Sequence, residues 1–234
     1  MKIKLAELII ELATPDEYTT LMCKDYIYNG EKDADITAIC TKEDIEKEKK
    51  VSPGFLDKYL ENTCIYRNIC KEMINFDAML IHSAAVMVDG EGYLFTALSG
   101  TGKTTHVNLW LEKFGERAVI INGDKPIIRK MDKGFRVFGT PWCGKEGINT
   151  NTDAPIAGIC ILKRGTENTI RRITKAEALV QIMNQTVRPK EKERMSRLLD
   201  LLERLLKEVP VYELFCNMDI SAADVSYNGM SKKV

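Results

Sequence analysis

The sequence has no net charge, few histidines and no long hydrophobic run. Lysine plus arginine number 34 and aspartate plus glutamate also number 34, so the formal net charge at pH 7 is zero. Proteins that bind nucleic acid or anionic membranes through their overall field carry an excess of positive charge. We therefore expect neither partner, and any cationic site must be local.

Signals for membrane insertion or secretion are also missing. The apolar runs at residues 5–12, 79–88 and 156–162 are far shorter than the roughly 20 residues that span a bilayer. The first ten residues alternate charged and apolar side chains, without the apolar stretch and cleavage site of a signal peptide. We expect a cytoplasmic protein.

Patterns for disulfides and zinc are absent as well. The cysteines number seven and are never spaced as Cys-x-x-Cys, and Cys40, Cys160 and Cys216 lie within apolar runs, where a thiol behaves as a small hydrophobic group. The two histidines, His82 and His106, are too few and too isolated to build a transition-metal site with these thiols. Reduced core cysteines are the expectation.

The composition is that of a folded protein. The chain has 234 residues, 44% hydrophobic and 29% charged, which is typical of globular proteins and unlike disordered chains. This length suits one domain, or one domain with a small addition. Both strand-like and helix-like segments occur along the chain, so we predict an α/β fold.

Residues 1–76 are predicted to form a small α+β appendage. A strand is expected at 3–12 and a second apolar stretch at 34–40. Thr41 and Asp44 resemble the N-cap pair of a short helix, and a second helix is expected from Ser52 and Pro53 to Phe76.

Residues 77–220 are predicted to form the core, and the polar residues 221–234 a loosely ordered tail. Apolar runs at 79–88 and 93–98 flank turn residues and predict a β-hairpin. The other expected elements are a helix at 103–114, strands at 118–121, 156–162 and 211–215, a hairpin of 127–129 with 135–138, a helix at 174–184 and a long helix from Pro189.

The strongest functional signal is the segment LSGTGKTT between the hairpin and the first core helix. In a Walker A loop, backbone N–H groups and a helix N-terminus surround phosphate oxygens, a lysine reaches the β- and γ-phosphates, and the next hydroxyl binds Mg²⁺. Ala97 stands where the pattern has its first glycine, and an ordinary glycine-rich turn is the alternative. The predicted phosphate-binding residues are Ser99, Gly100, Thr101, Gly102, Lys103, Thr104 and Thr105.

A nucleotide site also needs a carboxylate near the loop, to bind Mg²⁺ or to accept the proton of the phosphoryl acceptor. Asp124 directly follows a predicted strand and is the candidate, against the alternative of a turn aspartate. Lys125 either faces the phosphates or is a solvated lysine. His82 could orient the carboxylate, or could be a core histidine.

Three further segments carry candidate cations. The loop at residues 138–145 ends at Lys145 and is either functional or a structural corner anchored by Trp142. Arg188 and the segment 163–165 could contact phosphate or acceptor, although a solvated cation is the commoner role of such residues.

Together, His82, the hairpin, LSGTGKTT and the sequence Asn122-Gly123-Asp124 resemble the P-loop kinases of the HPr kinase/phosphorylase and phosphoenolpyruvate carboxykinase superfamily. The resemblance extends more weakly from about residue 59 to 189, and is greatest to small stand-alone bacterial carboxykinase-like proteins. It implies the carboxykinase-like P-loop fold, an α/β fold that has a mixed sheet, a hairpin before the P-loop and flanking helices. It also implies that Lys103 and Thr104 bind phosphate and metal, and that His82 lies beside the catalytic acid.

The sequence departs from that superfamily at Lys125, where the family has a second acid after Asp124. The resemblance therefore leaves open whether Asp124 acts as the base or as a metal ligand. The chain is also shorter than full carboxykinases, so we do not expect carboxykinase activity.

Three functions are compatible with these residues. The first is an ATP- and Mg²⁺-dependent kinase acting on a hydroxyl of a peptide, protein or small molecule, with Asp124, His82 and Lys103 as its catalytic residues. In it Thr104 and Asp124 bind the metal, and Lys125, Lys145 and Arg188 stabilise charge. The second is a nucleotide-responsive binding module without turnover, and the third is phosphorolysis of a phosphoprotein. Family members often form homo-oligomers, which is possible here too.

Overall fold

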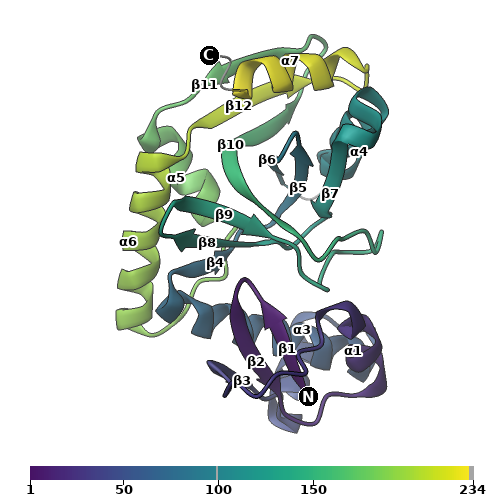
Figure 1. The fold of residues 1–234 in the computed structure, drawn as a ribbon, viewed down its shortest axis with the longest axis vertical. Coiled ribbons are helices and arrows are strands. Elements are labelled where there is room, and N and C mark those ends of the chain that lie inside the picture. The colour runs from purple at the N-terminus through teal and green to yellow at the C-terminus, as the bar shows by residue number, and fades with distance from the viewer. Residues whose placement is uncertain (99, 232–234) are drawn as a thin grey trace.

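The computed structural model describes residues 1–98 and 100–231, and the predicted phosphate-binding residue Ser99 lies outside this part of the chain. The architecture is mixed α/β, as predicted (Figure 1). The strands are β1 (Lys2–Leu5), β2 (Leu8–Leu12), β3 (Ile36–Ala38), β4 (Ala78–Leu80), β5 (Ser83–Val88), β6 (Glu91–Thr96), β7 (Ala118–Asn122), β8 (Ile127–Met131), β9 (Gly134–Phe138), β10 (Asp153–Arg164), β11 (Thr169–Arg172) and β12 (Val211–Cys216).

The helices are distributed along the whole chain. They are α1 (Glu17–Met22), α2 (Lys42–Val51), α3 (Asp57–Met73), α4 (Lys103–Phe114), α5 (Lys175–Met183), α6 (Lys192–Glu208) and α7 (Ser221–Met230). Short 3-10 turns occupy Lys24–Tyr26, Ile74–Phe76 and Gly115–Arg117. No helix in the described part of the chain is both long enough and apolar enough to cross a bilayer.

The larger sheet has the strand order β4-β8-β9-β10-β6-β5-β7, and β12 extends it by pairing with β10 and with β11. Strand β10 runs parallel to β6 and to β12. Strand β5 is antiparallel to both β6 and β7, so β6 and β7 point the same way. The carboxyl ends of β6, β7, β10 and β12 and the start of β5 therefore meet at one edge of the sheet.

Helices cover both faces of this sheet. In strand β5, Ala84 and Val86 pack with Trp110 of α4 on one face. Ala85 faces the opposite side, where the core includes Leu198 and Leu202 of α6. This alternation follows from the twofold side-chain period of a strand. The leucine stripe predicted for the long helix is buried at Leu198, Leu201, Leu202, Leu205 and Leu206.

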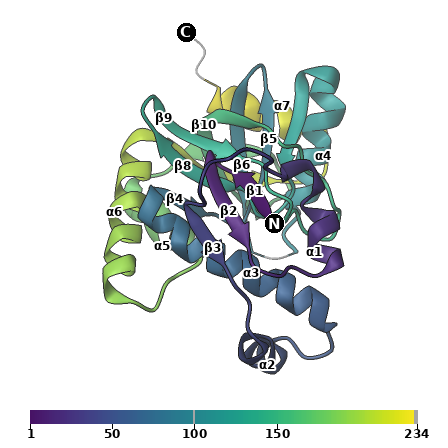
Figure 2. The ribbon, with the colours of Figure 1, turned by 60° about the horizontal axis from the view of Figure 1, so that its bottom comes forward.

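The N-terminal residues form a second, three-stranded sheet of β1, β2 and β3, which lies with α1 and α3 against one end of the larger sheet (Figures 1 and 2). Helix α3 and this sheet share a core with Leu80 and Ile127 of the larger sheet and with Trp142 of the loop that follows β9. Helix α2 begins with the predicted capping box of Thr41 and Asp44.

Several element boundaries differ from the sequence expectations. Residues 3–12 form two strands, because Ala6 and Glu7 adopt positive φ angles of 48° and 64° and turn the chain back. The run 79–88 is also divided, because β4 pairs with β8 whereas β5 pairs with β6 and β7. The helices expected from Ser52 and Pro189 begin later, at Asp57 and Lys192.

The C-terminal tail is also more ordered than expected. Residues Ser221–Met230 form helix α7, whose small residues Ala222, Ala223 and Ser226 are buried. Small side chains let the helix approach α4 and β11 closely, so a segment with little apolar bulk still packs on the core. The expectation of a loosely ordered tail was wrong for these residues.

Candidate active site

The glycine-rich segment connects β6 to α4, as the sequence predicts for a phosphate-binding loop. Gly100 and Gly102 have positive φ angles of 76° and 118°, a backbone conformation that glycine adopts without strain. Gly102 is the N-cap residue of α4, and Lys103 and Thr104 form its first turn. Thr104 is half-buried and Thr105 is exposed. The loop thus directs the N-terminus of a twelve-residue helix toward the sheet edge.

Lys103 is nearly buried, with 9% of its surface exposed. Burial lowers the pKa of its ammonium group, the positive charge of Lys125 lowers it further, and the charge of Asp124 opposes both. Within the described part of the chain, the Lys103 side chain has no hydrogen bond or ion pair. A desolvated cation without such a partner is suited to bind an anion.

Asp124 follows the end of β7 and lies beside the start of β5. Its Oδ1 is 2.8 Å from Nε2 of His82, and its Oδ2 is 3.0 Å from Nζ of Lys125. Burial alone would raise the pKa of Asp124, but the hydrogen bond from His82 and the charge of Lys125 outweigh it. The pKa therefore lies well below its usual range. Asp124 is an ionised carboxylate at neutral pH.

His82 is held from both sides. Its Nδ1 lies 3.2 Å from Oε1 of Gln185, and its backbone N–H donates to the Gln185 carbonyl at 2.8 Å. The hydroxyl of Thr96 donates to the His82 carbonyl at 2.8 Å. The antiparallel pairing of β5 and β6 brings His82 next to the strand that leads into the glycine-rich loop.

Buried Asn122 shapes the turn that carries Asp124. Its side-chain Oδ1 accepts hydrogen bonds from the backbone N–H groups of Asp124 and Lys125, at 2.9 and 2.7 Å. Its Nδ2 donates to the carbonyl and the hydroxyl of Thr140, at 3.0 and 3.1 Å. One amide side chain therefore couples the acid-bearing turn to the loop that follows β9.

The loop after β9 is fixed in place by the contacts of Trp142, and it also lies against Asp124. The indole of Trp142 stacks on Tyr66 with ring centroids 4.2 Å apart, and its Nε1 donates to Oδ1 of Asn62 at 2.8 Å. Two residues later, Gly144 has a φ of 81° and packs so closely that an added Cβ would lie 2.8 Å from Cβ of Asp124. The backbone at Gly144 therefore fixes where the carboxylate can lie.

Two predicted cations do not join this cluster. Lys145 is exposed on the loop beyond Gly144, and Arg188 is exposed between α5 and α6. In the described part of the chain, neither has a hydrogen bond or ion pair to Lys103, Asp124 or His82. Their predicted part in phosphate binding has no support from a contact.

Other residues join the site without having been given a role from the sequence. Gln185 orients His82, and an isolated glutamine carries no recognisable motif. Asn122, noted in the sequence only as part of Asn122-Gly123-Asp124, orients the turn that carries Asp124. Arg164 was considered only as one of several candidate cations. Its guanidinium Nη2 donates to the carbonyl of Gly100 at 2.7 Å, which links the end of β10 to the glycine-rich loop.

Comparison with known proteins adds a structural neighbour. The sequence matches no protein-family model, and no match was found among curated proteins. Among solved structures, the chain is similar to the Hpr(Ser) kinase/phosphatase from Coxiella burnetii, with a TM-score of 0.39 and 12% sequence identity. The alignment covers 64% of this chain and 88% of that one.

Proposed function

We propose that this protein is an ATP- and Mg²⁺-dependent kinase, with HPr kinase-like chemistry, that phosphorylates a hydroxyl of a peptide, protein or small molecule. The observation that supports this most is the meeting of three groups at one sheet edge: the buried Lys103, the ionised Asp124 and its partner His82. A desolvated cation beside a glycine-rich loop attracts phosphate, and a neighbouring carboxylate can accept a proton.

The roles of the residues follow from their positions. The backbone of Gly100 to Gly102 and the ammonium group of Lys103 hold the phosphates of ATP. The acceptor oxygen forms a bond to the γ-phosphorus while the bond from that phosphorus to the β–γ bridging oxygen breaks, and ADP leaves. Asp124 accepts the proton of the acceptor hydroxyl, and His82 is a positioning residue that holds the carboxylate.

The residues present suit a magnesium ion that is bound mainly through the substrate. Within residues 1–98 and 100–231, no group of three or more His, Cys, Asp or Glu side chains is placed to hold a metal. Mg²⁺ commonly binds through one or two protein ligands plus phosphate oxygens and water. Thr104 and Asp124 are the proposed ligands, and the ion would neutralise charge on the transferred phosphoryl group.

Lys125 gives this site a cation beside Asp124. Its Nζ contacts Oδ2 of Asp124, and 38% of its side chain is exposed, so it can move toward an incoming phosphate. We assign Lys125 a charge-stabilising role in the transition state, and Lys145 and Arg188 the same role once nucleotide and acceptor are bound.

Calorimetric titration and an ADP-release assay test the proposal together. Mg-ATP is titrated into the wild type, Asp124→Asn and the control Asp132→Asn, which makes the same change at an exposed turn. ADP release is then measured against a panel of serine- or threonine-containing peptides, carrier proteins and small alcohols. We expect acceptor-dependent ADP release that falls about 100-fold or more in Asp124→Asn, and a smaller rise in its Kd for Mg-ATP, because the variant loses one proposed Mg²⁺ ligand.

The other outcomes separate the alternatives. Tight binding of Mg-ATP without ADP release for any acceptor would favour the non-catalytic nucleotide-responsive module. Formation of pyrophosphate from phosphate and a phosphoprotein would favour phosphorolysis. Absence of Mg-ATP binding by the wild type would reject the phosphate-loop interpretation itself.

A further inference from the structure

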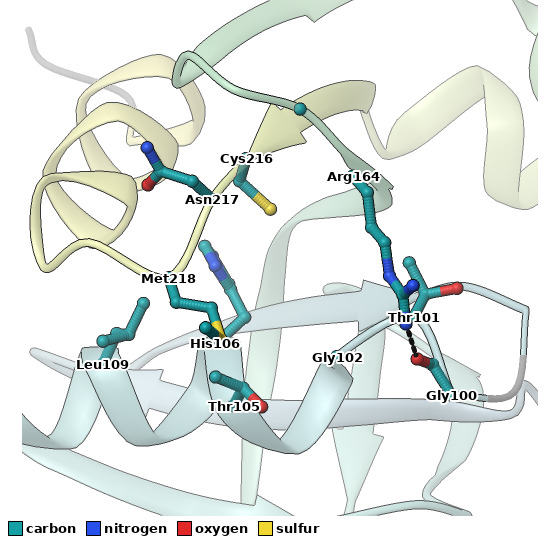
Figure 3. A pocket seen from close by; sticks show the side chains of 11 residues that line it. Gly100, Thr101, Gly102, Thr105, His106, Leu109, Arg164, Cys216, Asn217 and Met218 are labelled. Carbon is teal, nitrogen blue, oxygen red and sulfur yellow. Dashed lines mark hydrogen bonds between the residues drawn. The ribbon is translucent and has the colours of Figure 1, made fainter.

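Side chains of the N-terminal appendage contact the site at its acid-bearing turn. This turn, residues 122–125, carries Asp124, and the loop of residues 138–150 lies against it. The appendage forms side-chain hydrogen bonds with these two segments through Tyr26, Asn62 and Tyr66. By contrast, the cavity beside the first turns of α4 is lined by residues between positions 100 and 218 (Figure 3). The appendage therefore meets the site on the side of the proposed base.

Tyr66 of α3 contacts the residue that directly follows Asp124. Its hydroxyl donates to the backbone carbonyl of Lys125 at 2.6 Å, and the hydroxyl of Thr140 donates to the same carbonyl at 2.9 Å. The backbone N–H of Lys125 donates in turn to Oδ1 of Asn122 at 2.7 Å. Hydrogen bonds at both ends of Lys125 therefore fix the backbone beside the carboxylate.

The Tyr66 ring is itself held in one place. It is buried and lies nearly parallel to the stacked indole of Trp142, with an angle of 5° between the ring planes. Asn62 is four residues earlier on α3, so both side chains lie on the same face of the helix. Asn62 accepts the Trp142 N–H, and its own Nδ2 donates to the buried Thr19 hydroxyl of α1 at 3.2 Å. Burial raises the pKa of Tyr66 well above its usual value, so the hydroxyl stays a donor where carboxylates titrate.

Tyr26 connects a different part of the appendage to the same region. Its hydroxyl accepts a hydrogen bond from Nδ2 of Asn149 at 2.8 Å, and this Nδ2 also donates to the carbonyl of Thr140 at 2.8 Å. Next to Asn149, the carbonyl of Ile148 accepts the backbone N–H of Gly123 at 3.0 Å. The loop that Tyr26 contacts is thus bonded directly to the acid-bearing turn.

We propose that the appendage is an integral part of the phosphoryl-transfer site, with Tyr66 as a positioning residue for Asp124 and Tyr26 bracing the neighbouring loop. The inference rests on the proposed function and adds which part of the chain holds the proposed base. A carboxylate that accepts a proton in the transition state must be held in a productive geometry by the groups behind it. Without the Tyr66 hydroxyl, the Lys125 carbonyl keeps the Thr140 hydroxyl as a donor, and the turn gains freedom.

Tyr66→Phe and its matched control Tyr59→Phe test the inference in the full chain. Tyr66→Phe removes the hydroxyl but keeps the ring that stacks on Trp142. Tyr59→Phe makes the same change on the same helix, at a ring that is 40% exposed and stacks on Phe55.

Three measurements are made on each variant. ADP release against pH is measured with whichever acceptor of the panel described above gives the highest rate. Calorimetry gives the Kd for Mg-ATP. Amide hydrogen exchange of Asp124 and Lys125 is followed by NMR in the nucleotide-free protein, and circular dichroism checks folding.

We expect kcat to fall about tenfold in Tyr66→Phe, with the Kd for Mg-ATP changed less than about threefold, because the carboxylate is retained and only its freedom increases. The looser contact with Lys125 raises the pKa of Asp124 toward its usual range, so the acid limb of the pH–rate profile moves to higher pH. Amide exchange at Asp124 and Lys125 should be about tenfold faster, since their N–H groups belong to the loosened turn. Tyr59→Phe should change none of these quantities.

The result that overturns the inference differs from the one that overturns the proposed function. If the wild type is active and Tyr66→Phe has the kcat of Tyr59→Phe, the inference is wrong even where amide exchange is faster, because Tyr66 then only stabilises the fold. If Tyr66→Phe does not fold, Tyr26→Phe decides: a lower kcat with an unchanged Kd supports the inference, and the kcat of the wild type overturns it. If the wild type neither binds Mg-ATP nor releases ADP, the proposed function fails and the positioning role fails with it.

Discussion

The imidazole Nε2 of His82 lies 2.8 Å from Oδ1 of Asp124, although 42 positions separate the two residues in the chain. The opposite ring nitrogen faces the side-chain oxygen of Gln185 at 3.2 Å. Because Nε2 faces the Asp124 carboxylate and the opposite nitrogen faces Gln185, the ring is fixed between the two side chains and holds the carboxylate in one orientation beside the glycine-rich loop. The pair is thus built into the packing of β5, β7 and the end of α5.

Substitution of His82 should separate turnover from nucleotide binding. His82→Ala removes the hydrogen bond that holds Asp124, so we expect turnover to fall about 10- to 100-fold with the Kd for Mg-ATP changed less than about threefold. The lost hydrogen bond also raises the pKa of Asp124, so the acid limb of the pH–rate profile should move to higher pH. His82→Gln can still donate an N–H group and should retain more activity. Equal losses in binding and turnover would contradict a positioning role.

Replacement of Lys125 should change the pH at which acid unfolds the protein. The pKa of Asp124 is depressed in the folded state, so its contribution to stability is complete above its unfolded pKa of about 4 and is lost as pH falls toward the folded value. Lys125→Met removes one cause of that depression. We expect acid unfolding, followed by tryptophan fluorescence, to begin at higher pH than in the wild type. The effect on the free energy of unfolding should stay below about 1 kcal/mol because the pair is partly exposed. The exposed-turn control Lys133→Met should not shift the transition, and a shift as large as that of Lys125→Met would contradict the assignment.

Replacement of Lys103 should leave the free protein at least as stable and should remove its binding of Mg-ATP. Its ammonium group is desolvated without a described partner, so Lys103→Met should leave the melting temperature of the free protein unchanged or raised. Under the proposed function, we expect Mg-ATP at about 100 times its Kd to stabilise the wild type by about 2.7 kcal/mol, and this stabilisation should disappear in the variant. Thermal melts with and without Mg-ATP measure both effects, with exposed Lys42→Met as control. A large loss of stability in the free variant would show that Lys103 has a structural partner.

The close approach of Gly144 to Asp124 can be tested with a matched glycine. Gly144 and Gly147 both have positive φ angles, 81° and 65°, so alanine strains the backbone at either position. Only at Gly144 would the new Cβ meet Asp124, whereas nothing lies within 4 Å at Gly147. We expect both variants to lose about 1 kcal/mol of unfolding free energy, and Gly144→Ala to lose further stability and most turnover. Denaturant unfolding and the ADP-release assay measure these effects. Equal activity in the two variants would show that the contact does not position Asp124.

Much of the local structure could be predicted because its signals lie within a few residues of each other. Helix α4 begins and ends where its glycines and apolar spacing predict, and the capping boxes at Thr41 and Thr174 are both formed. The turn between β5 and β6 follows from Asp89 and Gly90, which adopt positive φ angles. In contrast, the turn at Ala6 and Glu7 carries no glycine or asparagine, so one strand was expected where two are present.

The sequence by itself determined the glycine-rich loop, the helix that follows it and an acid at the end of the next strand, because each depends on short-range backbone preferences. Tertiary structure decided the rest. The pairing of β5 with β6 and β7 brings His82 to Asp124, and the chain after α5 brings Gln185 to His82. The parallel pairing of β6, β10 and β12 brings Arg164 and Met218 to the loop. These contacts join segments tens of residues apart, and strand order, which short-range patterns do not encode, determines which segments meet.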